Sequence, residues 1–326
     1  MSLVSEATVS VDPLVELLAG GGPVLALAPM QDVTDLPFLR LVSARGGADL
    51  YYTEYFRVHA TAQLERETLR TITENPTGRP IIAQLIGNDV EALARASRQL
   101  QKYPVAAIDL NLGCPAPIVY RKCAGGGLLR EPGRVDAILG ALREASPRFT
   151  VKTRVGFAEA SEFDRLLPIL ARHGPDLVTV HGRTVMEMYR PHVHVDRVAQ
   201  AVKELPCPVL ANGGVDSVAK ARRMLEMTGA RGLMIGRGAI RNPWLFGQIR
   251  AELGGEGSVQ PTGREVLAYI RELWETTSPG GLVPAKQVQK LKKYLGFIGE
   301  GVGAEFLHQA RRVQTEGGLF GLCDLW

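Results

Sequence analysis

The sequence predicts an α/β fold in which eight strands alternate with helices and close into a (β/α)8 barrel, followed by a small helical domain. Two observations predict it. Eight short runs of aliphatic and β-branched residues are separated by longer segments whose apolar residues recur every three or four positions. Near-continuous apolar strands that alternate with helices are typical of a parallel sheet covered by helices, and eight such units in one domain favour a closed barrel.

The predicted strands follow one another at barrel spacing. They are expected at residues 24–30, 48–54, 80–86, 105–112, 149–155, 176–181, 208–212 and 231–236. Helical periodicity is clearest at residues 90–102, 134–145, 163–173 and 217–227.

An open, doubly wound sheet is the alternative to a barrel. Its usual nucleotide-binding signal, a G-x-G-x-x-G turn after the first strand, is absent here, which favours the TIM barrel. The glycine-rich segment 254–258 and Pro261 end the barrel pattern, and amphipathic segments follow them. We therefore expect an N-terminal extension at 1–19, a barrel at 20–255 and a helical domain at 256–326.

Composition excludes several classes of protein. Of the 326 residues, 45% are hydrophobic and 22% are charged, as in an ordinary globular protein. The start of the chain lacks a basic segment followed by an apolar core, and no stretch approaches the roughly 18 uncharged apolar residues of a membrane span. We expect a cytoplasmic protein without a membrane partner, and a monomer.

The cysteines and the net charge give weaker information. Four cysteines without a C-x-x-C pair argue against a disulfide framework and against a zinc site, so no metal is expected. The net charge of +4, from 38 basic and 34 acidic residues, is too small to indicate nucleic acid by itself.

Polar residues stand at the end of nearly every predicted strand. In a barrel these ends converge on the face that carries catalysis, so scattered residues become one ring around one pocket. The ring is expected to contain Met30 with Gln31, Glu54, Gln84, Asn111, Lys152 with Arg154, His181, Asn212 and Arg237.

Glycine turns follow the last two strands. The first is Asn212-Gly213-Gly214 and the second is Gly236-Arg237-Gly238. The loops after strands seven and eight form the recurrent phosphate site of barrel enzymes, because glycine lets backbone N–H groups approach a phosphate. Tight turns that need positive φ angles are the simpler explanation.

Lys152 lies at the end of an interior strand, where a cation without a partner is unfavourable. A reduced flavin would supply the missing negative charge at its N1/O2 edge. Gln84 and His181 are placed to hydrogen-bond the remaining ring edges and the phosphate.

A cysteine follows the fourth strand, in the segment Asn111-Leu112-Gly113-Cys114-Pro115. The loop after it contains Arg121, Lys122 and the run Gly125-Gly126-Gly127. A partly exposed thiol near cations can act as acid, base or nucleophile. The glycine run fits either a loop that moves over a substrate or one whose backbone approaches it closely.

Seven short motifs follow one another in order along the predicted barrel. They are Ala28-Pro29-Met30, Ala83-Gln84-Leu85, Asn111-Leu112-Gly113-Cys114-Pro115, Val151-Lys152-Thr153-Arg154, His181-Gly182-Arg183-Thr184, Asn212-Gly213-Gly214 and Gly236-Arg237-Gly238. This set resembles the tRNA-dihydrouridine synthases, and the N-x-G-C-P element is its most diagnostic member.

This resemblance implies a cofactor, a reductant and a reaction. The cofactor would be FMN, with NADPH as reductant, and the substrate a uridine in tRNA. Reduced FMN would deliver hydride to C6 of the uracil and Cys114 would protonate C5, while Asn111 pairs with the uracil edge and Arg154 and Arg183 meet the base or nearby phosphates. The implied FMN ligands are Pro29, Met30, Gln84, Lys152, His181, Asn212, Gly213, Gly214, Gly236 and Arg237.

The chain departs from the family pattern at two places. Pro117-Ile118 stands where relatives carry a lysine or another polar residue, and residues 191–196 replace an expected Asp-Trp pair. Both departures concern the substrate side. The histidine pair His192 and His194 lacks a nearby third metal ligand in the sequence.

Three lysines of the C-terminal segment fall on one helical face: Lys286, Lys290 and Lys293. A solvated helix face and an RNA-binding stripe explain this pattern equally well, and the resemblance favours tRNA. Tyr294 and Phe297 are expected in the core.

Two other functions fit parts of the sequence. Another FMN barrel oxidoreductase, similar to dihydroorotate dehydrogenase, would share the phosphate loops and the lysine, but it would not need a basic helical domain. A non-catalytic RNA-binding protein on a degenerate barrel would not need both the flavin residues and the thiol.

Overall fold

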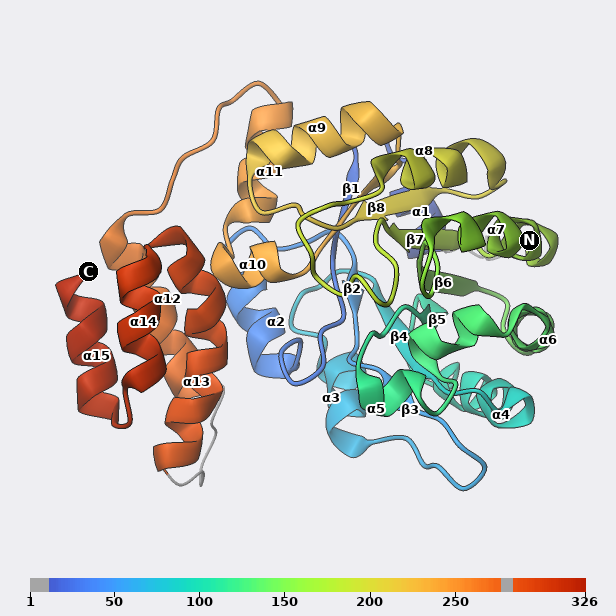
Figure 1. The fold of residues 1–326 in the computed structure, drawn as a ribbon, viewed down its shortest axis with the longest axis horizontal. Helices are drawn as coiled ribbons and strands as arrows, with labels where there is room; N and C mark the ends of the chain where they lie inside the picture. The colour runs from blue at the N-terminus through green and yellow to red at the C-terminus, as the bar shows by residue number, and fades with distance from the viewer. Residues whose placement is uncertain (1–11, 277–283) are drawn as a thin grey trace, which may run out of the picture.

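The computed structural model describes residues 12–276 and 284–326, and within them it confirms the predicted barrel. The strands are all parallel and hydrogen-bonded in the order β1-β9-β8-β7-β6-β5-β4-β2, with β3 on β4 (Figure 1). A bridge between Ala26 and Leu50 joins the two ends of this order and closes the barrel. The strands are β1 (Val24–Leu27), β2 (Tyr51–Tyr52), β3 (Phe56–Arg57), β4 (Ile81–Ile86), β5 (Ala107–Leu112), β6 (Phe149–Arg154), β7 (Leu177–His181), β8 (Val209–Asn212) and β9 (Gly232–Ile235).

Helices surround the barrel, and several begin at a residue whose side chain caps the first turn. Asp35, Asp89 and Ser217 each accept a hydrogen bond from a backbone N–H of the helix that follows. The helices are α1 (Pro13–Ala19), α2 (Leu36–Ser43), α3 (Arg66–Glu74), α4 (Val90–Leu100), α5 (Pro117–Tyr120), α6 (Pro132–Ala145), α7 (Phe163–His173), α8 (Val195–Glu204), α9 (Val218–Thr228), α10 (Arg237–Arg241) and α11 (Leu245–Leu253), with 3₁₀ turns η1 (Gly125–Arg130) and η2 (Ala160–Glu162).

The inside of the barrel changes from apolar to polar along the strands. Leu14 of α1 packs with Val24, Ala26 and other inward-facing residues near the strand beginnings. Alternate residues of a strand face the same side, so the next inward layers contain Asp109 and then Asn111 on β5. The polar layer therefore lies at the carboxyl ends of the strands.

The second predicted strand is shorter than expected and is followed by a separate piece. Residues 48–54 were predicted, whereas regular pairing with β4 covers Tyr51–Tyr52 and resumes at Phe56–Arg57. Between these pieces the Glu54 carboxylate accepts a hydrogen bond from the backbone N–H of Val33 at 3.0 Å. The segment thus turns away from β4 toward the loop after β1.

The C-terminal helices pack beside α2 and α10 (Figure 1). The Tyr269 hydroxyl donates to the carbonyl of Ile240 at 3.0 Å, and Arg45 forms an ion pair with Glu272 at 2.7 Å. Tyr294 is buried, as expected, and Phe297 is partly buried against the core. These helices are α12 (Gly263–Thr276), α13 (Pro284–Ile298), α14 (Ala304–Arg312) and α15 (Glu316–Leu325), with the 3₁₀ turn η3 (Gly299–Gly301).

Candidate active site

The carboxyl ends of the strands bring the predicted polar residues together. Strand register places Asn111 beside Lys152, and it places His181 between Arg154 and Asn212. Because these are inward or strand-end positions of neighbouring strands, they belong to one face of the barrel.

Three side chains, those of Asn111, Gln84 and Asp109, form a continuous chain of hydrogen bonds inside this face. Asn111 Oδ1 accepts from the backbone N–H groups of Gly113 and Cys114 at 3.0 and 2.9 Å, and Asn111 Nδ2 donates to Gln84 Oε1 at 2.8 Å. Gln84 Nε2 donates to Asp109 at 2.7 Å. The Gln84 and Asn111 amides thus bind each other here, and their expected contacts with flavin and uracil stay predictions.

Several cations meet at this face, and burial makes each charge less favourable. Desolvation, and then the charge of Arg154, lowers the pKa of Lys152 to about 8. Desolvation also lowers the pKa of Arg154 to about 10. The pKa of Arg183 is lowered by desolvation and by the charge of Arg237. The pKa of His181 is held well below its ordinary value by burial and by these same cations, so His181 is neutral. The face is suited to receive an anion.

Arg154 is buried and binds backbone carbonyls. Its Nε donates to Gly113 O at 2.8 Å, and its Nη1 donates to Thr184 O and Met188 O, each at 2.8 Å. Arg154 therefore connects the cysteine loop to the loop after β7, and its expected contact with the substrate stays a prediction.

Arg183 is also buried, and it fixes the tautomer of a neighbour. Its Nη1 lies 3.0 Å from His181 Nε2, and its Nε and Nη2 donate to Arg190 O and Pro191 O at 2.5 and 3.2 Å. A guanidinium can only donate, so His181 Nε2 accepts and the ring carries its proton on Nδ1. The substrate contact expected for Arg183 is untested.

The glycine turns after β8 and β9 bring the backbone close to the ring of side chains. Gly213 and Gly214 have φ angles of 122° and 72°, and a Cβ at Gly213 would come within 2.9 Å of the His181 ring. A Cβ at Gly236 would lie 3.2 Å from Met30 Sδ. The positive φ angles fit the simple turn explanation, and the close approach leaves backbone N–H groups at the site.

Other predicted ligands have partners within the protein. Asn212 Nδ2 donates to the carbonyl of Met234 at 2.7 Å, and the guanidinium of Arg237 stacks on the Tyr189 ring at 4.6 Å. The loop from Met30 is closed by Thr34, whose hydroxyl accepts from the Met30 N–H at 2.9 Å. Pro29 precedes this loop at the end of β1.

The cysteine loop packs tightly against the triple glycine. Gly126 N donates to Cys114 O at 3.1 Å, and a Cβ at Gly125 would meet the Cys114 Cβ at 2.9 Å. Gly125, Gly126 and Gly127 are all buried in η1. The glycine run therefore serves close packing under the thiol. Cys114 itself is partly exposed.

The three lysines of α13 differ among themselves. Lys286 and Lys293 are exposed. Lys290 forms an ion pair with Asp35 at 3.5 Å, which connects α13 to the beginning of α2. The structure does not test their expected tRNA contacts.

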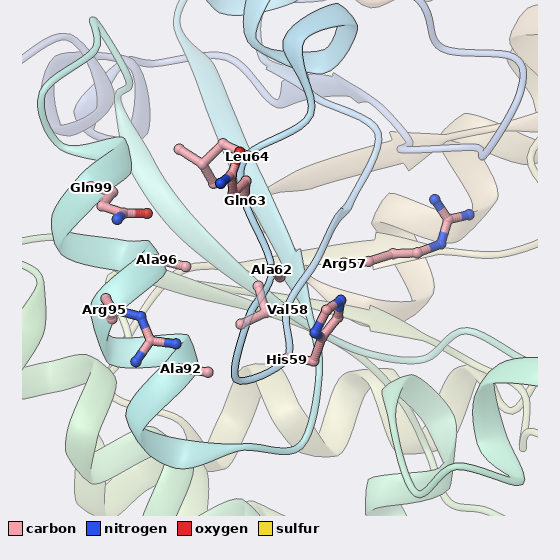
Figure 2. A pocket seen from close by; sticks show the side chains of 10 residues that line it. All are labelled: Arg57, Val58, His59, Ala62, Gln63, Leu64, Ala92, Arg95, Ala96 and Gln99. Atoms are coloured by element: carbon pink, nitrogen blue, oxygen red, sulfur yellow. The ribbon is translucent and has the colours of Figure 1, made fainter.

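Two hollows in the surface lie away from these residues. One, of about 10 Å³, lies between α4 and the loop that carries His59 and Leu64, and Figure 2 shows the side chains around it. It has room for about one water molecule. The other, of about 670 Å³, lies by α1 and α11 and is lined by Leu17, Val24 and Leu253 among others. Neither hollow is lined by a predicted site residue. The candidate active site is therefore defined by the polar side chains at the strand ends.

Two kinds of feature were not found among the residues that the structure describes. No helix there is long and apolar enough to cross a membrane. Nor do those residues contain a group of three or more His, Cys, Asp or Glu side chains able to hold a metal ion. His194 instead contacts Glu187 at 2.9 Å.

Sequence reasoning missed Asp109, which joins Gln84 to Thr150. Burial raises the pKa of this carboxyl group to about 6, although the hydrogen bonds from Thr150 and Gln84 act to lower it. A single acidic residue inside the predicted strand 105–112 was the available signal.

Comparison with known proteins gives a consistent assignment. A family model described as dihydrouridine synthase (Dus) matches residues 26–290. A tRNA-dihydrouridine(16) synthase of Ralstonia nicotianae is 35% identical over 314 residues, which are 92% of this chain and 95% of that protein. The protein of the same name from Cupriavidus necator is 34% identical over 261 residues, covering 76% of this chain and 81% of that protein.

Solved structures support the fold alone. Histamine dehydrogenase from a Rhizobium species has a TM-score of 0.55 at 13% identity, covering 71% of this chain and 46% of that one. Since the family model covers most of the barrel and the curated relatives cover most of the chain, the chain belongs to the dihydrouridine synthase family.

Proposed function

We propose that this protein reduces the C5–C6 double bond of a uridine in tRNA, using FMN and NADPH. The observation that carries the proposal is a partly exposed thiol, Cys114, beside a face rich in buried cations. The family assignment supports the reaction, and the names of the relatives with position 16 favour that uridine.

The residues present fit FMN. Lys152 is a desolvated cation, Arg237 stacks on Tyr189, and the turns at Gly213, Gly214 and Gly236 leave backbone close to the site. A phosphate would bind the turns and Arg237, and Lys152 would face the N1/O2 edge of the ring. When bound and reduced, FMN would supply the hydride that adds to C6.

The protein's own groups would complete the reaction. The Cys114 thiol donates a proton to C5, which leaves a thiolate that solvent reprotonates. Lys152 and Arg154 lie close enough to Cys114 to interact with it electrostatically. Asn111 holds the Cys114 backbone in place and presents its amide at the edge of the same face.

Substrate recognition would involve α13 and a flipped base. A uridine in folded tRNA must leave its stack to enter a barrel pocket. Lys286, Lys293 and Lys290 would contact phosphates, so tRNA affinity should fall with salt. We expect the protein to act as a monomer in the cytoplasm.

The test is nucleoside mass spectrometry of unmodified tRNA incubated with the protein, FMN and NADPH. A gain of two hydrogens mapped to position 16 is the expected result. Flavin binding and NADPH oxidation without any such gain would instead indicate a flavoenzyme that acts on a small molecule. A protein that binds tRNA but takes up no flavin would indicate a non-catalytic RNA-binding function.

A further inference from the structure

A buried carboxylate lies at the far end of the hydrogen-bond chain that holds the cysteine loop. Asp109 is fully buried in β5, and its two oxygens accept from Thr150 Oγ1 at 2.6 Å and from Gln84 Nε2 at 2.7 Å. An ionised carboxylate can only accept hydrogen bonds, so Gln84 must turn its NH₂ group toward Asp109.

This orientation determines every later bond. Because Gln84 Nε2 donates to Asp109, Gln84 Oε1 faces Asn111 as an acceptor. Asn111 must therefore donate to it from Nδ2. Asn111 Oδ1 is then left to accept from Gly113 N and Cys114 N. If the chain were reversed, the Asn111 NH₂ group would face two backbone N–H groups, and those two donors would lose their acceptor.

We propose that Asp109 is a positioning residue for Cys114, because it sets the direction of the amide chain through Gln84 and Asn111. It acts on the thiol loop from the middle of the barrel. The inference rests on the proposed role of Cys114 as the acid, and its tests use neither tRNA nor turnover.

The first test compares two substitutions of the same carboxylate. Asp109→Asn keeps an oxygen for Gln84 if the Thr150 hydroxyl turns to accept from the new NH₂ group. The buried Tyr52 hydroxyl lies beside Thr150 and can then accept from the Thr150 hydroxyl. Asp109→Leu offers Gln84 no acceptor.

The readout is the rate at which iodoacetamide alkylates Cys114 in the full-length protein, with Cys123 as internal reference. Asp109→Asn should stay within about twofold of the unmodified protein, whereas Asp109→Leu should react roughly fivefold faster at Cys114, the ratio that corresponds to one ordinary hydrogen bond. The Cys123 rate should not change. Equal Cys114 rates in the two variants would overturn the proposal.

The second test uses a coupling that only the amide chain predicts. Asn111→Asp places a carboxyl group against Gln84 Oε1, which Asp109 keeps from turning, so this contact favours the protonated form of the new group, whereas Lys152 on the neighbouring strand and the N–H groups of Gly113 and Cys114 favour the ionised form. The pKa of the new group should therefore be higher with Asp109 present than beside Asp109→Asn, and the loss of stability as pH rises from 6 to 8.5 should be larger.

Adding Asp109→Asn should remove this extra pH dependence. Gln84 can then turn, donate to the carboxylate at position 111 and accept from the amide at position 109, while Thr150 donates as before. Adding Asp109→Leu also removes the acceptor that keeps Gln84 from turning, so it should relieve the pH dependence too, although Gln84 Oε1 then has no donor at position 109. A double variant with Asp109→Asn that is as pH-sensitive as Asn111→Asp alone would refute the proposal.

The two tests fail separately from the proposed function. If Asn111→Asp does not fold, the alkylation comparison still decides the question. If tRNA is never reduced while both tests succeed, the proposed reaction is wrong and the amide chain stands.

Discussion

Lys152→Met should stabilise the flavin-free protein and weaken its flavin site. Burial and Arg154 lower the pKa of Lys152 from 10.5 to about 8, so holding its charge in the folded state at pH 7 costs roughly 3 kcal/mol at about 1.4 kcal/mol per pKa unit. Methionine keeps the apolar stem without the charge. The free energy of unfolding should therefore rise at pH 7 by up to that amount.

The sign of the pH dependence follows from the direction of the shift. A lysine whose folded-state pKa is lowered carries its full penalty below about pH 8, and the penalty disappears as pH rises toward 10.5. The advantage of Lys152→Met should thus shrink between pH 7 and pH 9.5. Urea unfolding of the flavin-free protein at both pH values measures it.

The control is Lys286→Met, which replaces an exposed lysine and should change stability by no more than about 0.5 kcal/mol. FMN affinity should fall in Lys152→Met and not in the control. If Lys152→Met is less stable than the unmodified protein at pH 7, or if its advantage is the same at both pH values, the argument from buried charge is wrong.

Three further predictions concern the thiol, the lysines and the loop after β1. Cys114→Ala should keep FMN but lose most uridine reduction, about 10²- to 10⁴-fold in rate, since the general acid is gone; single-turnover kinetics measures it. Lys286→Glu combined with Lys293→Glu should weaken tRNA binding and reduce its salt dependence, as measured by filter binding at several salt concentrations. Glu54→Gln should stabilise the protein at pH 8 by roughly 1 to 3 kcal/mol, measured by urea unfolding. Burial raises the pKa of Glu54 from 4.5 to about 7, so stability is lost as pH rises through that interval, while glutamine still accepts from Val33 N.

Each of these predictions has an outcome that would contradict it. Normal turnover in Cys114→Ala would remove this thiol as the acid. Unchanged tRNA affinity in the lysine variant would assign those side chains to a solvated face, and Lys220→Glu, a change on α9, is the matched control. For Glu54→Gln, a gain of equal size at pH 5 and pH 8 would show that ionisation is not the cause.

The barrel could be predicted because its signal is local. The runs at 105–112 and 149–155 contain β5 and β6 with at most two residues of difference at either end. Strand ends in a parallel barrel share one face whatever their order, so the ring of polar residues followed from the fold class. The second strand was wrong in extent because the Glu54 carboxylate binds the loop after β1, a contact between residues 21 positions apart.

Hydrogen-bond partners could not be predicted in the same way. Arg154 and Arg183 were expected to meet the substrate, which stays a prediction, and the carbonyls that both bind belong to loops that sequence periodicity does not place. Lys290 looked like one of three equivalent lysines, yet only a tertiary contact brings Asp35 next to it. Such pairings depend on distances between elements, and one sequence does not contain them.

The barrel wall has its fewest paired residues between β1 and β2. It contains the isolated bridge at Ala26 and Leu50, whereas β5 and β6 pair over five positions. Helix α2 connects β1 to β2, and α12 packs on α2. The C-terminal helices therefore support the part of the barrel wall that has the fewest paired residues, and a chain truncated before α12 would lose the helix that packs on α2.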